Sequence, residues 1–205
     1  NIDVLVGHTE EGAGGRISLS AGDTSDEGTQ AGDIMISGGE STNGIGGNVD
    51  MKGGKSEDAA GGSITLTSGL SKTGPSGDIT FSSAIGGSNG ASGDVSIATG
   101  MTLDGDVGSI SVETGESTNG RSGSIALTVG ATDSGTGGEI TVNGGSTSDG
   151  AATSSGGDIN VAAGNGVGLG GLLSIKSGES SAQAGGDIEV TVGTGSGVGA
   201  AGGQL

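Results

Sequence analysis

Apolar and polar side chains alternate along short segments of the chain, and these segments recur. In the copy GSITLTSG, the side chains of Ile64, Leu66 and Ser68 would share one face of an extended chain, and those of Thr65 and Thr67 the other. Alternation of apolar, mostly β-branched residues with polar ones is typical of a β-strand with one buried face. Each copy therefore predicts one short strand.

The segments keep a nearly constant spacing. Their first apolar positions lie 14 to 19 residues apart, most often 15. A disordered glycine-rich tract would not keep such a register over the whole chain. The complete copies are 15–22, 32–39, 47–54, 62–69, 77–84, 93–100, 108–115, 123–130, 138–145, 157–164, 171–178 and 186–193; partial copies run from Ile2 to Gly7 and from Gly203 to Leu205.

A repeat with one strand cannot bury its apolar face alone, so neighbouring repeats must stack. We expect an all-β fold, a glycine-rich β-solenoid of about 13 units of about 15 residues, as a single continuous array over residues 1–205. Two windings remain open, with one unit per coil or, in a flattened solenoid, two. The second is favoured because the connecting segments hold almost no large apolar residue. Handedness stays undetermined, and an antiparallel sandwich is the alternative fold.

The alternation predicts an inward ladder with two sizeable side chains from each segment. The third inward position is usually small, as at Ala21, Gly38 and Ser68, which fits a layer that narrows toward a corner. The ladder consists of Ile17, Leu19, Ile34, Ile36, Ile64, Leu66, Ile79, Phe81, Val95, Ile97, Ile110, Val112, Ile125, Leu127, Ile140, Val142, Ile159, Val161, Leu173, Ile175, Ile188 and Val190.

The segments between the predicted strands are rich in turn-forming Gly, Ser, Thr, Asp and Asn. Asn-Gly pairs, each of which predicts a bend with positive φ, begin at Asn43, Asn89, Asn119, Asn143 and Asn165. The chain has no N-x-[ST] sequon, so the serines and threonines of these turns are the candidates for glycosylation, as O-glycans.

Composition narrows the partners. The net charge is −18, from 24 acidic and 6 basic residues, which disfavours binding to nucleic acid and to anionic membranes. No apolar run approaches the roughly 20 residues of a membrane span, so we expect no membrane insertion. With 52 glycines and Phe81 as the single aromatic residue, the chain cannot build a conventional core of large side chains.

Catalytic chemistry is not indicated. The chain has no cysteine and one histidine, His8, so a zinc site of the usual composition and a partnered nucleophile are both excluded, and we expect no enzyme and no cofactor. Acidic residues often precede the first apolar position of a repeat. If these carboxylates stack, they are weak candidates for calcium, and otherwise they are solvated; the candidates are Asp78, Asp94, Glu139 and Asp158.

Two apolar side chains per repeat do not offset the entropy of ordering so many glycines. Both ends of the chain cut through a repeat. We therefore expect an excerpt of a longer protein that is ordered within a filament, among copies of itself or related repeat proteins.

The runs AGGSITLTSG and SGDVSIATG, with their spacers rich in Ser, Thr and Gly, resemble the repeats of the sexually induced protein family of diatoms and related stramenopiles. The resemblance covers nearly the whole chain, although the cysteine-rich modules of epidermal-growth-factor type found in that family are absent. It implies a structural subunit of an extracellular filament or flagellar hair (mastigoneme) at the flagellar surface, self-assembling through stacked β-strands. It transfers no catalytic residue.

The alternative function is a cell-surface adhesin or a β-solenoid that binds a ligand or ice. An ice-binding surface would present a flat array of threonines. The outward positions of the repeats include Met35, Asp50, Asn160 and Glu189, which interrupt such an array.

Overall fold

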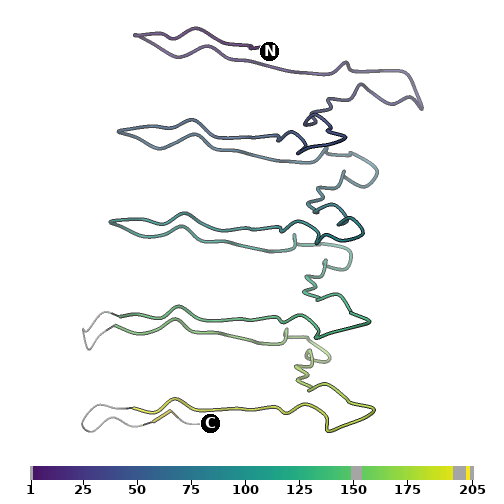
Figure 1. Cartoon of the computed structure of the whole chain (residues 1–205), viewed down its shortest axis with the longest axis vertical. Helices are drawn as coiled ribbons and strands as arrows, with labels where there is room; N and C mark the ends of the chain where they lie inside the picture. The colour runs from purple at the N-terminus through teal and green to yellow at the C-terminus, as the bar shows by residue number, and fades with distance from the viewer. Residues whose placement is uncertain (1, 149–153, 196–201, 204–205) are drawn as a thin grey trace. The chain divides into compact units, whose positions relative to one another are not determined.

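The computed structural model describes residues 2–148, 154–195 and 202–203. Within these ranges the backbone alternates between extended segments and bends or turns, without a helix or a β-strand (Figure 1). The expected all-β solenoid is therefore wrong for the described part of the chain, which has little regular secondary structure. The first residue, Asn1, and the last two residues of the final partial repeat, Gln204 and Leu205, lie outside the described residues.

The physical reason is the lack of backbone partners. A β-strand is defined by ladder hydrogen bonds to a neighbouring strand. In the described ranges, the backbone hydrogen bonds lie at the connecting loops: most join two glycines that flank a loop, and two more are turn bonds, to Asp26 and Gly87. The segments with alternating side chains are extended, as predicted. In the described ranges, however, no neighbouring segment forms ladder hydrogen bonds with them.

The side chains of the extended segments do follow the predicted period of two. Thr141 donates its hydroxyl to the carboxylate of Glu139 at 2.8 Å, and Thr191 donates to Glu189 at 3.1 Å. Ser111 makes the same contact with Glu113. Each pair joins residues i and i+2, so these polar side chains share one side of the backbone, as an extended chain requires.

Each complete repeat ends at a loop that returns the chain beside itself. We use the term loop base for the two residues, nearly always glycines, that end one repeat and begin the next. At Gly69 and Gly77, for example, the Gly77 N–H donates to the Gly69 carbonyl at 3.0 Å. The same bond, at 2.8 or 2.9 Å, closes the bases of loops 22–32, 39–47, 54–62, 164–171 and 178–186, and also joins Gly157 to Gly145 and Gly203 to Gly193.

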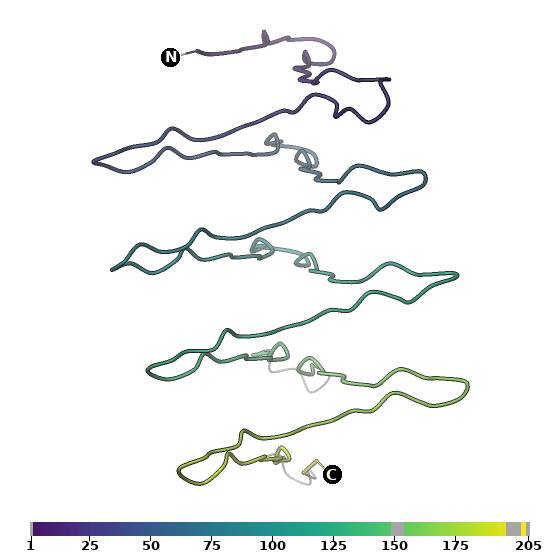
Figure 2. The same cartoon turned by 90° about the vertical axis from the view of Figure 1, so that its right-hand side faces the viewer.

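The chain divides into two compact units, Asn1–Ser109 and Ile110–Leu205. Within the first unit, loops 7–15, 54–62 and 100–108 extend to the same side, at the left in Figure 1. The loops between them extend in other directions in the view turned by 90° (Figure 2). Two other loops lie between each of these loops and the next one along the chain. In this unit the chain therefore returns to the same side after three repeats, whereas one or two repeats per coil were expected.

No described residue is buried. The best-covered positions are half-buried and lie beside loops, among them Ala21, Gly38, Ser68 and Val192. In the described part of the chain, no helix is long and apolar enough to cross a membrane.

Candidate functional site

The loop bases are the best-defined local structures of the chain, and at some of them close approach requires glycine. A Cβ added at Gly62 would lie 2.8 Å from the backbone nitrogen of Gly54. A Cβ added at Gly38 would clash with the carbonyl oxygen of Gly47, on the other side of its loop. At these positions glycine therefore allows two backbone segments to meet, which a side chain would prevent.

In most repeats, the third inward residue lies against the glycine that begins the next repeat; Gly108, after Thr99, has no such neighbour. A Cβ added at Gly77 would lie 3.6 Å from the Cβ of Ser68, which is ordinary contact. A Cβ added at Gly138 would lie 2.7 Å from Cγ1 of Val129, which is too close. The small third position predicted from the sequence is thus a partner of this glycine at the base of a loop.

The size of this third residue correlates with closure of the loop base. The base hydrogen bond is present where the residue is Gly, Ala or Ser, at Ala21, Gly38, Gly53, Ser68, Gly144, Ala163 and Ser177. Among the described residues it is missing where the residue is β-branched, at Val6, Thr99, Thr114 and Val129. Val192 is the exception, since the Gly203 N–H still donates to the Gly193 carbonyl at 2.9 Å. The loop 84–93, after Ser83, begins at Ala84 instead of a glycine, and its base lacks the hydrogen bond.

One class of loop is organised by a serine two residues after the first base glycine. The Ser71 hydroxyl oxygen accepts the backbone N–H of Gly74 at 2.9 Å, and Ser117 accepts that of Gly120 at 3.0 Å. Ser56 and Ser180 accept the N–H three residues ahead in the same way, each at 3.0 Å. This side-chain turn replaces a backbone hydrogen bond within the loop.

A second class has threonine at the same position and a left-handed glycine further on. Thr102 donates its hydroxyl to the carbonyl of Asp104 at 3.1 Å, and Gly105 follows with a φ of 109°. Thr9 and Thr132 donate to the carbonyl two residues ahead in the same manner. The glycines with positive φ are Gly12, Gly28, Gly105 and Gly135, and all four follow a Gly-x-Thr sequence.

These loops correct the expectation of positive φ at the Asn-Gly pairs. All five pairs lie in the described ranges, and none of their residues has a positive φ. In the pair at Asn119, the bend is held by the Ser117 hydroxyl instead. The relevant sequence signals, Gly-x-Ser and Gly-x-Thr at the start of a loop, were present in the chain but were not used in the prediction.

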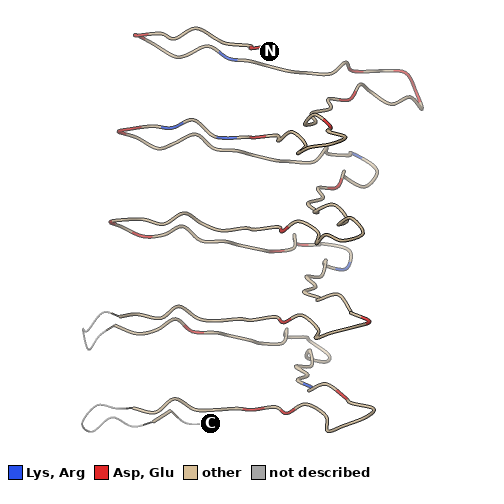
Figure 3. Ribbon diagram, in the orientation of Figure 1, with Lys and Arg blue, Asp and Glu red and all other residues tan. Residues whose placement is uncertain are grey.

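Charged groups are exposed and scattered, as Figure 3 shows. The ion pair found among the described residues joins Lys55 to Glu57 at 3.3 Å, with both side chains more than four-fifths exposed. An exposed pair of this kind contributes little to stability. Acidic residues outnumber basic ones along loops and segments alike, which leaves the chain with its net charge of −18.

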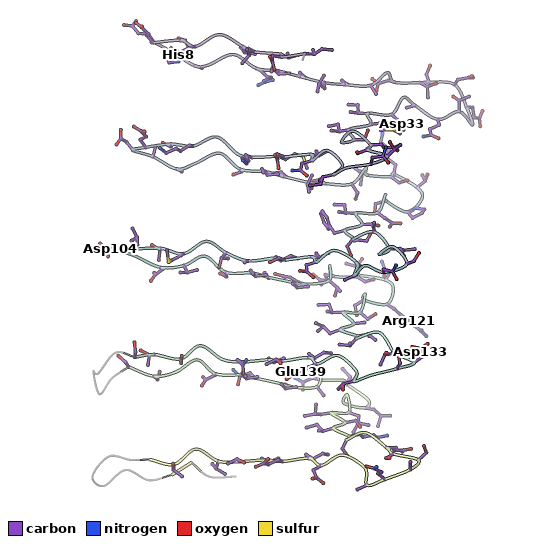
Figure 4. The ribbon with its side chains drawn as sticks, viewed as in Figure 1. His8, Asp33, Asp104, Arg121, Asp133 and Glu139 are labelled. Atoms are coloured by element: carbon purple, nitrogen blue, oxygen red, sulfur yellow. The ribbon has the colours of Figure 1, made fainter. Side chains whose placement is uncertain are left out.

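The weak calcium candidates Asp78, Asp94, Glu139 and Asp158 are all exposed. The described residues contain no group of three His, Asp or Glu side chains able to hold a metal ion. Glu139, labelled in Figure 4, accepts the hydroxyl of Thr141. His8 lies near the tip of loop 7–15 in the same view, exposed to solvent. The structure does not bring these candidates together.

The residues of the predicted inward ladder are exposed in a regular manner. Across the twelve complete repeats, the first apolar side chain is 48–59% exposed, and the second is 54–80% exposed. The first position is the less exposed of the two in every repeat except that of Ile64 and Leu66, where the values are 55% and 54%. The same unit of structure therefore presents the same apolar pair throughout the chain.

Comparison of the chain with protein-family models, curated proteins and solved structures finds no match.

Proposed function

We propose that this chain is a structural subunit of an extracellular filament, and that it has no catalytic role. The observation that carries the proposal is the recurrence of one exposed unit: an extended segment with two apolar side chains, followed by a loop. The first apolar position keeps an exposure of 48–59% in all twelve complete repeats. A chain built for one binding or catalytic event needs one special site, whereas a filament subunit needs many equal contacts.

The resemblance of the repeats to those of the sexually induced protein family extends the proposal to a flagellar hair, or mastigoneme, at the cell surface. In such a filament the partners are copies of this chain or related repeat proteins. The Ser and Thr residues of the loops are the candidates for O-glycans, because most of those in the described ranges are exposed.

Electron microscopy of material purified from the native source tests this role. The expected result is regular filaments that antibodies against loop 54–62 label at a constant axial interval. Antibodies against an unrelated surface protein of the same cells provide the control for labelling. Isolated folded monomers at every concentration, with no labelled filament in the native material, would overturn the proposal.

A further inference from the structure

The chain exposes far more surface than a folded protein of its mass. Its accessible surface is 20215 Å². A folded monomer of 18.8 kDa exposes roughly 8,300 Å². The difference, about 12,000 Å², is several times the area of a stable protein interface, about 1,200–2,000 Å². The described conformation therefore offers more than enough surface to bind another chain.

This surface contains two kinds of group that a partner could cover. The apolar pair of each repeat is about half exposed or more, as at Ile79 and Phe81, which are 49% and 68% exposed. The backbone N–H and C=O groups of the extended segments, away from the loop bases, make no backbone hydrogen bond in the described ranges. Unpaired extended backbone is a template for pairing with another extended chain.

The spacing of these groups selects the partner. The apolar pairs recur about every 15 residues, and the first position is the less exposed in all but one of the complete repeats. An unrelated chain could match one or two repeats before its own apolar positions fell out of register. Another copy of this chain has the same spacing along its length, so every repeat can meet a repeat.

We propose that the first and second apolar positions of the repeats form a surface that binds a second copy of this chain, repeat against repeat. The inference deepens the proposed filament role and rests on it for its biological setting. In the complex, the apolar pairs of two copies bury each other, and the extended backbones supply hydrogen bonds to one another. The polar positions between them, such as Thr65 and Thr67, stay outside this contact.

Charge makes the proposal distinguishable from binding to a basic partner. Two copies, each with a net charge of −18, repel each other at low salt. Raising NaCl from about 0.02 M to about 0.5 M shortens the Debye length from roughly 20 Å to roughly 4 Å and screens this repulsion. Association between copies should therefore strengthen with salt, whereas binding to a polycation should weaken.

Sedimentation velocity of the purified full chain over a range of concentrations tests the inference at both salt concentrations. The matched variants are Ile64→Asp with Leu66→Asp, and Thr65→Asp with Thr67→Asp. Both add two negative charges to the same segment, but on opposite faces. None of the four side chains is buried in the single chain, so neither variant removes a core contact.

We expect reversible association of the unmodified chain that is stronger at high salt, and at least about tenfold weaker for the Ile64/Leu66 variant. The Thr65/Thr67 variant should weaken it much less at high salt. Three results would overturn the inference: equal weakening of self-association by both variants, self-association that weakens at high salt, or a monomer at every concentration. If native filaments are labelled but the purified chain stays monomeric, the inference is wrong and the proposed filament role is retained. If the purified chain self-associates but the native material contains no labelled filaments, the inference is supported and the filament role is wrong.

Discussion

Gly77 donates its backbone N–H to the carbonyl oxygen of Gly69 over 3.0 Å, and this bond closes a loop around Ser71. Ser68, which precedes Gly69, lies at the base of this loop. A Cβ added at Gly77 would lie 3.6 Å from the Cβ of Ser68. A small side chain beside a glycine thus leaves room for the two backbones to meet. In most of the described loops, the closure of the base follows the size of this one residue.

Replacing Ser68 with Val should open the base of loop 69–77. A β-branched side chain would bring a γ-methyl toward Gly77; at the unclosed base of loop 130–138, Cγ1 of Val129 lies 2.7 Å from the place that a Cβ on Gly138 would occupy. The lost hydrogen bond would cost about 0.5–1.5 kcal/mol of local stability. The measurement is the through-hydrogen-bond NMR coupling between the Gly77 amide nitrogen and the Gly69 carbonyl carbon. Ser68→Ala is the control and should keep the coupling, because the bases beside Ala21 and Ala163 are closed. Retention of the coupling in Ser68→Val would contradict the steric explanation.

The converse substitution should close an open base. Thr114 lies beside Gly123, where an added Cβ would be 3.2 Å from its Cγ2, and loop 115–123 lacks the base hydrogen bond. In Thr114→Ala, we expect a new coupling from the Gly123 amide nitrogen to the Gly115 carbonyl carbon. Thr114→Val keeps the β-branch and should show none. If neither variant gains the bond, features of the loop other than residue 114 hold this base open.

The sequence predicted the positions of the loop bases better than the fold. Most of the predicted segments, such as Gly62 to Gly69, are bounded by glycines, and at eight bases these glycines are joined by a hydrogen bond. Alternation also placed Glu139 and Thr141 on one side of the backbone. These features depend on local geometry, which a short stretch of sequence determines.

Strand pairing could not be predicted in the same way. Whether Ile64 and Leu66 face a neighbouring strand depends on contacts far along the chain or in another chain. Alternation indicates only that one face of the segment is apolar, and it does not identify the segment that covers this face. The loop conformations were mispredicted for a different reason. Asn-Gly preference was applied at Asn119, although the Ser117 hydroxyl satisfies the Gly120 N–H and no positive φ is needed.

The serine of a Gly-x-Ser loop should control exchange of one backbone amide. In Ser71→Ala, the Gly74 N–H loses the acceptor that now lies 2.9 Å away. We expect hydrogen exchange of that amide to accelerate about 3- to 10-fold, the equivalent of one ordinary hydrogen bond. NMR exchange at single-residue resolution measures the change. Thr73→Ala, in the same loop, removes a hydroxyl that accepts no such bond and should leave the Gly74 rate unchanged. Equal rates in Ser71→Ala and the unmodified chain would show that the serine does not hold the turn.

The left-handed glycine of a Gly-x-Thr loop should resist substitution. Gly105 has a φ of 109°, a conformation that strains any residue with a Cβ, although no heavy atom lies within 4 Å of the place a Cβ would occupy. Gly105→Ala should therefore cost about 1 kcal/mol or more of loop stability through the backbone alone. The expected result is a change in the amide shifts and the HN–Hα couplings of loop 100–108, together with weakening of the Thr102 hydroxyl contact to Asp104. Gly108→Ala is the matched control, since Gly108 also has open space around it but no positive φ. If both substitutions disturb the loop equally, loss of glycine flexibility in general, and not the left-handed conformation, is the cause.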